Sequence, residues 1–274
     1  MPTLDRPNGS LNYIIDGPGK APVTVVLIHG LCCALADWSS QIAALAPRHR
    51  VLACDLRGHG ASRFETGFDI HTYGEDVAAL LESLAIERAV LVGHSMGCRV
   101  VLQTAGLVPG RVRALVLVDG SRFVVDDPQR AGEKARAFIE ANGGWDNTVR
   151  RLFTDMFIAG SDPEYMATIV ERAARVPEAV GSQLFASMTA WDAGEMGQVL
   201  DSLNAELMVV QSTCVNAARE RVSVEARQTN PWLDFVREHV PGARIELVTG
   251  VGHFSQIEAA DTVNDLIEQM AASV

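Results

Sequence analysis

Short runs of β-branched and aliphatic residues recur along the chain, and most of them end at glycine, histidine or aspartate. The runs cover 23–28, 50–56, 89–92, 113–118, 207–211 and 244–248. Continuous apolar runs of this kind, rather than alternating ones, are typical of strands buried on both faces of a parallel sheet. The run 11–15 alternates more and precedes a turn sequence, so it predicts an antiparallel edge hairpin with the first residues.

Between these runs, apolar residues recur at helical spacing. One stripe extends from Val77 to Leu84, and the residues Thr72 to Glu75 before it have the pattern of a capping box. Near the end of the chain, Asp261 is placed to cap a last helix. Strands that alternate with helices predict an α/β fold, in which helices cover both faces of a parallel sheet.

The alternation stops between about 122 and 203, where helical patterns continue without a convincing strand. We therefore predict a core formed by 1–121 and 204–274, and a helical cap or lid formed by 122–203. The cap sequence is rich in aromatic residues and methionine, and we assign most of these to the cap's own core. A minority is expected to line a substrate pocket: Trp145, Phe157 and Trp191.

Composition limits which binding partners and which cellular compartment are expected for the chain. The 274 residues are 48% hydrophobic and carry a net charge of −11, which excludes a disordered chain and disfavours nucleic acid as a partner. No apolar stretch is long enough for a membrane span, and we see no signal-peptide pattern. Five cysteines without regular spacing indicate a reducing compartment, so we expect a cytoplasmic protein. The oligomeric state stays open.

The strongest chemical signal is the segment Gly93-His94-Ser95-Met96-Gly97. It has the pattern G-x-S-x-G, follows a predicted strand and precedes a predicted helix. A nucleophile on such a sharp turn needs small neighbours, and the turn aims the next backbone N–H at a developing oxyanion. The sequence therefore predicts Ser95 as the nucleophile and the amide of Met96 as one oxyanion donor.

Together with three further motifs, this segment resembles the α/β-hydrolase family over nearly the whole chain. His29-Gly30 is similar to the family's oxyanion loop, 55–62 to its D-x-x-G-x-G-x-S turn, and 250–254 to the loop of the catalytic histidine. The resemblance implies a mostly parallel, eight-stranded sheet flanked by helices with an inserted lid. It also implies that Leu31 supplies the second oxyanion N–H and that His253 is the general base.

The acid of the catalytic triad departs from the commonest family pattern. Most members carry it shortly after the seventh strand, where this chain has no carboxylate before Glu220. A minority carry it after the sixth strand, and Asp119 ends that strand 24 residues beyond Ser95. We predict that Asp119 orients the histidine. Asn216 as a neutral orienter, Glu220 and Asp192 remain alternatives.

These residues predict a serine hydrolase that forms an acyl-enzyme on a small or medium apolar ester, lactone or related acyl compound. Cys32, His94 and Phe254 lie next to the predicted catalytic residues in sequence and are expected to border the substrate pocket. We expect no metal and no organic cofactor, because the chain has no metal-ligand spacing and no dinucleotide-binding pattern.

Two other functions fit the same resemblance. The first is a cofactor-independent dioxygenase that cleaves an N-heteroaromatic ring of the quinolone type, because such enzymes also carry their acid after the sixth strand. It would use the His253–Asp119 pair to deprotonate its substrate. The second is a non-catalytic small-molecule receptor on a hydrolase scaffold.

Overall fold

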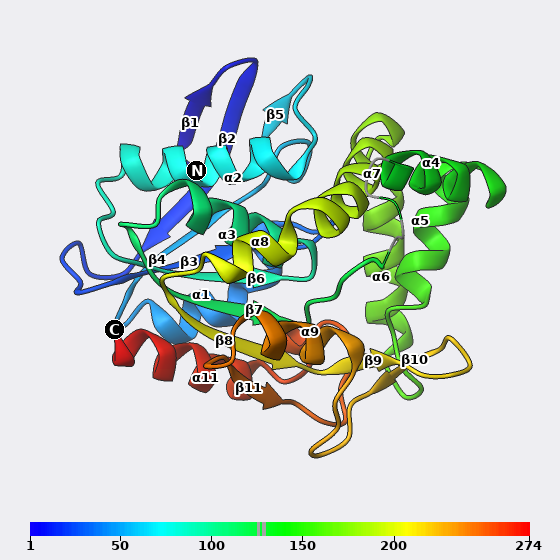
Figure 1. Ribbon diagram of the computed structural model, residues 1–274. Helices are drawn as coiled ribbons and strands as arrows, with labels where there is room; N and C mark the ends of the chain where they lie inside the picture. The colour runs from blue at the N-terminus through cyan, green and yellow to red at the C-terminus, as the bar shows by residue number, and fades with distance from the viewer. Residues whose placement is uncertain (125–126, 128–129) are drawn as a thin grey trace.

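The six apolar runs form neighbouring parallel strands of one sheet (Figure 1). The computed structural model describes residues 1–124, 127 and 130–274. The parallel strands lie in the order β4-β3-β6-β7-β8-β11. Their bounds are β3 (Thr24–Ile28), β4 (Arg50–Cys54), β6 (Ala89–His94), β7 (Val112–Val118), β8 (Glu206–Gln211) and β11 (Arg244–Leu247).

Antiparallel strands complete one edge of the sheet. The hairpin of β1 (Thr3–Arg6) and β2 (Gly9–Asp16) adds to β4, which confirms the predicted edge hairpin and gives a path of eight strands. The two-residue β5 (Arg63–Phe64) also pairs with β2. A separate hairpin of β9 (Thr213–Val215) and β10 (Arg221–Ser223) follows β8 and was not predicted.

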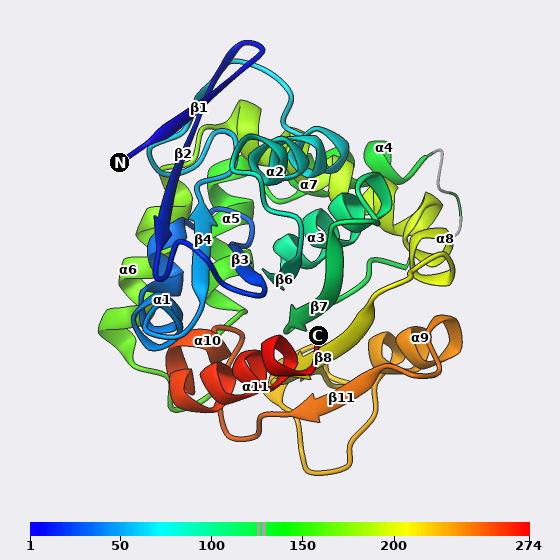
Figure 2. The same cartoon turned by 90° about the vertical axis from the view of Figure 1, so that its left-hand side faces the viewer.

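Helices cover both faces of the sheet. Figure 2 shows α2 (Ile70–Ser83) and α3 (Met96–Leu107) on one face and α1 (Ser39–Leu45) and α11 (Ala260–Ser273) on the other. In β3, Val26 and Ile28 pack into the first layer, whereas Val25 and Leu27 pack into the second. All four side chains are buried. A continuous apolar run is therefore needed, because both faces of the strand lie in a hydrophobic core. The remaining short elements of the core are η1 (Leu35–Trp38), α9 (Pro231–His239) and α10 (Ser255–Glu258).

Both predicted helix caps were wrong in position. The cap of α2 is Asp69, whose side chain accepts a hydrogen bond from the amide of Thr72 at 2.8 Å. The helix therefore starts before the predicted capping box. The last helix begins at Ala260 without a side-chain cap, and Asp261 lies in its first turn. There its negative charge is favourable because the amino end of a helix is positive.

The described residues between β7 and β8 form five α-helices. They are α4 (Ala131–Ala141), α5 (Trp145–Thr154), α6 (Pro163–Ala174), α7 (Glu178–Gly194) and α8 (Met196–Asp201), and we refer to them as the inserted helices. No strand occurs in the described part of 122–203, from which 125–126 and 128–129 are excluded. Figure 1 shows α4, α5 and α6 beyond the carboxyl ends of the strands. The division into core and cap stays a prediction. No helix in the described ranges could cross a lipid bilayer.

A buried ion pair fastens the inserted helices to the core. Arg99 of α3 donates to Asp192 of α7 through Nε at 2.7 Å and Nη2 at 2.6 Å. Each residue is 1% exposed. The guanidinium also donates to the carbonyl of Ser121 at 3.0 Å, and the amide of Phe123 donates to Asp192 at 2.7 Å. The pair therefore joins the start of the insertion to one of its helices and to α3.

We predict that Asp192→Asn lowers the free energy of unfolding by about 3–5 kcal/mol, because it leaves the buried charge of Arg99 uncompensated. Urea unfolding followed by circular dichroism measures the change. The double variant Arg99→Met/Asp192→Leu should recover much of the loss, since it removes both charges. Glu171→Gln breaks an exposed ion pair with Arg150 on the same insertion and should cost far less. Equal losses in Asp192→Asn and Glu171→Gln would contradict the prediction.

Candidate active site

Ser95 lies on a strained turn between β6 and α3. Its backbone has φ 55° and ψ −113°, a conformation that a residue with a side chain rarely adopts. A Cβ on Gly93 would lie 2.3 Å from the carbonyl oxygen of Gly97, and one on Gly97 would lie 2.4 Å from that of Ile28. Only glycine fits both positions, so the G-x-S-x-G pattern has a steric cause at this turn.

The structure brings His253 together with Asp119. Nδ1 of His253 lies 2.6 Å from Oδ2 of Asp119, which follows β7, and both side chains are buried. The alternative acids lie elsewhere. Asn216 and Glu220 bond to each other at the exposed turn of the β9–β10 hairpin, and Asp192 is engaged in the buried ion pair described above.

Asp119 is held as an anion by a dense set of donors. Its Oδ1 accepts from Nε2 of Gln211 and from the amides of Ser212 and Thr213, all within 2.9 Å. Its Oδ2 accepts from the hydroxyl of Thr213 at 2.6 Å. Burial by itself raises the pKa of this carboxyl, but the hydrogen bonds and the charge of its partners outweigh burial and lower the pKa to about 2.

His253 is a neutral base at pH 7. Burial lowers the pKa of His253 below its ordinary value of 6.5, although the hydrogen bond to Asp119 acts in the opposite direction. With its Nδ1 proton donated to Asp119, the ring keeps a lone pair on Nε2. That nitrogen is buried and has no hydrogen-bond partner among the described residues. It is therefore available to accept a proton from a hydroxyl.

His94 connects the serine turn to the histidine loop. Its Nε2 donates to the carbonyl oxygen of His253 at 2.9 Å, and the two rings have centroids 4.7 Å apart. Burial, together with the neighbouring His253, lowers the pKa of His94 to about 3. His94 therefore stays neutral. Because it directly precedes Ser95, its hydrogen bond links the serine turn to the backbone of His253.

The predicted oxyanion donors come from two segments that meet at Ser95. Met96 is the first residue of α3, so no turn of that helix uses its amide, and the positive end of the helix lies at this position. On the other side, a Cβ on Gly30 would lie 3.2 Å from Cβ of Ser95. The loop that continues into Leu31 therefore runs directly against the serine.

The predicted pocket residues divide into two groups. Phe254 has its ring centroid 5.4 Å from those of His94, His253 and Phe157, so Phe254 lies at the histidine and Phe157 packs against Phe254. Cys32 is buried, and its amide donates to a histidine of a neighbouring turn, His59, at 3.1 Å. Its place in the pocket stays a prediction.

Trp145 and Trp191 are packing residues of the inserted helices. A Cβ on Gly181 of α7 would lie 1.9 Å from the Trp145 ring, so the indole of Trp145 packs directly on that helix. Nε1 of Trp191 donates to Oε1 of Gln103 on α3 at 2.9 Å. Both indoles are buried. The sequence assigned them to the substrate pocket, and that assignment stays a prediction.

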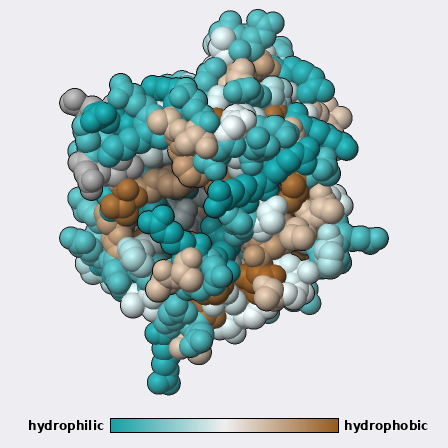
Figure 3. Space-filling view, turned by 90° about the vertical axis from the view of Figure 1, so that its right-hand side faces the viewer, coloured by the Kyte–Doolittle hydropathy of each residue, from teal (hydrophilic) through white to brown (hydrophobic). Residues whose placement is uncertain are grey.

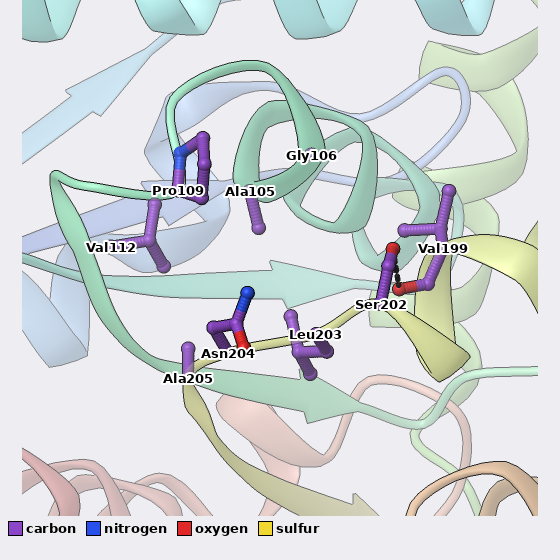
Figure 4. Close-up of a pocket in the computed structure, with 9 residues that line it drawn as sticks. All are labelled: Ala105, Gly106, Pro109, Val112, Val199, Ser202, Leu203, Asn204 and Ala205. Atoms are coloured by element: carbon purple, nitrogen blue, oxygen red, sulfur yellow. Dashed lines mark hydrogen bonds between the residues drawn. The ribbon is translucent and has the colours of Figure 1, made fainter.

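The cavities differ in how near they lie to Ser95, Asp119 and His253. The one in Figure 4, of about 210 Å³, lies at the amino ends of β7 and β8, where Val112 and Ala205 line it. It is at the opposite end of the strands from Ser95. A cavity of about 730 Å³ between the α5–α6 segment and the β9–β10 hairpin includes Phe157 and Arg221 in its wall. Neither Asp119 nor His253 is in that wall, and the link to them is Arg221, which lies 3.8 Å from Oδ2 of Asp119.

A third hollow lies on the surface of the inserted helices. It has about 370 Å³ and an apolar wall that includes Phe123, Phe138 and Phe185. Figure 3 shows the face of the molecule that carries the inserted helices, where hydrophobic residues lie among mainly hydrophilic ones. Within the described ranges, no group of three or more His, Cys, Asp or Glu side chains could hold a metal ion.

Sequence reasoning missed the residues that hold Asp119. Gln211, Ser212 and Thr213 stand at the end of β8, where most family members carry their acid. The two-residue β5 adds one to the strand count, so β7 and β8 are the sixth and seventh strands of the sequence analysis. Arg221 of β10 lies 3.8 Å from Oδ2 of Asp119. The missing carboxylate at this place was visible in the sequence. It could have indicated that these residues serve as donors to an acid located elsewhere.

Comparison with known proteins gives the family. The sequence profile described as the alpha/beta hydrolase fold matches residues 23–260. The chain belongs to the α/β-hydrolase family. Among its curated relatives, 3-oxoadipate enol-lactonase 1 of Acinetobacter baylyi is 32% identical over 169 residues, which are 60% of this chain and 62% of that protein.

Another relative of this α/β-hydrolase is the dihydrolipoyllysine-residue acetyltransferase component of the acetoin cleaving system of Pseudomonas putida. It is 44% identical over 108 residues, 39% of this chain and 28% of that protein. The aligned part thus spans less than two thirds of both relatives.

Solved structures match the fold over almost its full length. Est816, an N-acyl homoserine lactone degrading enzyme, has a TM-score of 0.80 and 23% identity, with 98% of this chain and 99% of that chain covered. The enol-lactonase from Burkholderia xenovorans has a TM-score of 0.76 and 23% identity, with 99% and 100% covered. At this identity the likeness shows the fold.

The influence of Asp119 on the pKa of His253 can be measured on the protein without a substrate. We predict that His253 titrates below pH 6.5 and that Asp119→Asn lowers its pKa further, because the hydrogen bond and charge of Asp119 act to raise it. NMR titration of imidazole nitrogen shifts tests this, with His253→Gln to assign the signal. A pKa that rises or does not move in Asp119→Asn would contradict the prediction.

Proposed function

We propose that this protein is a serine hydrolase that acts on carboxylic esters or lactones through an acyl-enzyme. The observation that carries the proposal is the buried His253–Asp119 pair. Nε2 of His253 has no hydrogen-bond partner among the described residues, and His94 bonds the backbone of His253 to the Ser95 turn. A weakly acidic hydroxyl, a neutral base and an ionised orienting carboxylate are the parts that nucleophilic acyl transfer requires.

The reaction follows from these groups. Nε2 of His253 takes the hydroxyl proton as Oγ of Ser95 attacks the carbonyl carbon of the substrate. The amides of Leu31 and Met96 stabilise the oxyanion that forms. The imidazolium, stabilised by Asp119, then gives its proton to the leaving oxygen as the acyl–oxygen bond breaks. Water repeats the sequence on the acyl-enzyme, so that His253 is neutral again at the end of the cycle.

The substrate class rests on the surroundings of the histidine. The ring of Phe254 lies beside His253, and Phe157 stacks on Phe254, which favours a small or medium apolar acyl compound. Two relatives are by name lactone-cleaving enzymes, which supports a lactone or ester as the bond that is cleaved. In this proposal the inserted helices act as the cap over the site, and the partner is a small molecule.

We predict that Ser95→Ala lowers kcat for short-chain p-nitrophenyl esters by at least about 10⁴-fold, because the acyl-enzyme cannot form. Mass spectrometry after a rapid quench should find the acyl group on the Ser95 peptide of the unaltered protein. Ser182→Ala is the control, since this hydroxyl only donates within α7 to the carbonyl of Glu178. Turnover that persists in Ser95→Ala would exclude the acyl-enzyme route.

One observation favours a second function, the cofactor-independent dioxygenase. The acid paired with His253 follows β7, as it does in the dioxygenases that the sequence resembles, and not β8. In that reaction His253 removes a proton from the organic substrate, and the resulting carbanion reacts with oxygen. Oxygen uptake with a hydroxyquinolone distinguishes the two functions. Uptake that survives Ser95→Ala and disappears in His253→Ala, without ester turnover, would replace the hydrolase proposal.

A further inference from the structure

A chain of hydrogen bonds leads from the surface of the molecule to the buried histidine. Nη1 of Arg221 donates to the hydroxyl of Thr213 at 2.7 Å. That hydroxyl donates to Oδ2 of Asp119 at 2.6 Å, and the same oxygen accepts from Nδ1 of His253 at 2.6 Å. The guanidinium is also 3.8 Å from the carboxylate itself. Every link joins a donor to a charged or hydroxyl acceptor.

The β9–β10 hairpin holds this arginine in place. The amide of Asn216 donates to the carbonyl of Glu220, and its side chain accepts from the amide of Glu220, which closes the turn. Ser223 pairs with Thr213 in the hairpin, and its hydroxyl accepts from the amide of Gly250 at 2.7 Å. The hairpin is thus attached both to the end of β8 and to the loop that carries His253.

We propose that Arg221 is a positioning residue of the active site, which acts through Thr213 to orient the carboxylate of Asp119 and to offset its charge. This inference rests on the proposed hydrolase function for its kinetic consequences. The geometry that supports the inference is independent of that function. The positively charged Arg221, on the β9–β10 hairpin that the sequence did not predict, lies against the buried carboxylate of Asp119.

The charges around His253 define what Arg221 contributes. Burial is the largest cause of the lowered pKa of His253, and the positive charge of Arg221 lowers this pKa further. Asp119 and, from α10, Glu258 act in the opposite direction. His94, from β6, is neutral and packs on the ring. Removal of the charge of Arg221 should therefore raise the pKa of His253.

Arg221 can be substituted without a hole in the core. Its side chain is 21% exposed and lines the cavity of about 730 Å³. Its Nε is buried and lacks a hydrogen-bond partner in the part of the chain that the structure describes. A shorter side chain would enlarge a cavity that already exists, so variants at this position should fold.

The test compares Arg221→Gln with Arg221→Lys, which keeps the charge, and with Arg219→Gln. Arg219 lies on the same hairpin and lines the same cavity, but within the described residues it has no hydrogen bond or ion pair with Asp119 or Thr213, so it is the matched control. The first readout is the NMR titration of His253, which needs no substrate. We expect a higher pKa in Arg221→Gln and a titration close to the unaltered protein in the other two variants.

The second readout is the pH profile of kcat/KM for a p-nitrophenyl ester. In Arg221→Gln the acid limb should move to higher pH, and kcat should fall about tenfold while KM changes little, because Arg221 does not touch the substrate. The fold decrease in kcat of the double variant Arg221→Gln/Thr213→Val should be smaller than the product of the fold decreases in the two single variants, since the arginine acts through Thr213.

The outcomes separate this inference from the proposed function. If the unaltered protein hydrolyses no ester, the hydrolase proposal fails, and the NMR titration still decides the role of Arg221. An unchanged His253 pKa in Arg221→Gln would overturn the positioning role. A higher KM with an unchanged kcat would also overturn it and would make Arg221 a substrate-binding residue.

Discussion

The arrangement of the candidate active site depends on one buried anion, the carboxylate of Asp119. An ionised group without contact to water is unstable unless donors and positive charge surround it. Here the donors come from the end of β8, from the β9–β10 hairpin and from the loop that carries His253. None of these segments could move away without leaving a buried charge unsatisfied. The carboxylate therefore fixes the relative position of three parts of the chain.

The parallel sheet brings Ser95, the proposed nucleophile, to the same place. In the pairing of β6 with β7, His94 is opposite Val118, and in the next pair Val118 is opposite Val210. The residues after these positions continue the pattern, since the amide of Ser95 donates to Val118 and that of Asp119 donates to Val210. Carboxyl ends of neighbouring parallel strands thus place the serine and the acid side by side, although they are far apart in sequence.

The predictions succeeded where one local pattern determines the structure. Both faces of the inner parallel strands are buried, so their apolar runs were visible without knowledge of their neighbours, and the turn at Ser95 needs its glycines whatever surrounds it. The predictions were wrong or absent where residues distant in sequence determine the local structure. The cap of α2 is Asp69, before the predicted capping box. The hairpin that carries Arg221 has three-residue strands, which are too short to show a period.

The place where most family members carry their acid has a different electrostatic role in this chain. With the carboxylate moved to the end of β7, the end of β8 supplies amides and a hydroxyl, and the following hairpin adds a positive charge. A second carboxylate at that place would repel the first, since two buried anions cannot both remain ionised at short distance. The absence of an acid after β8 and the presence of Arg221 therefore follow from a single constraint, the need to keep Asp119 charged next to His253.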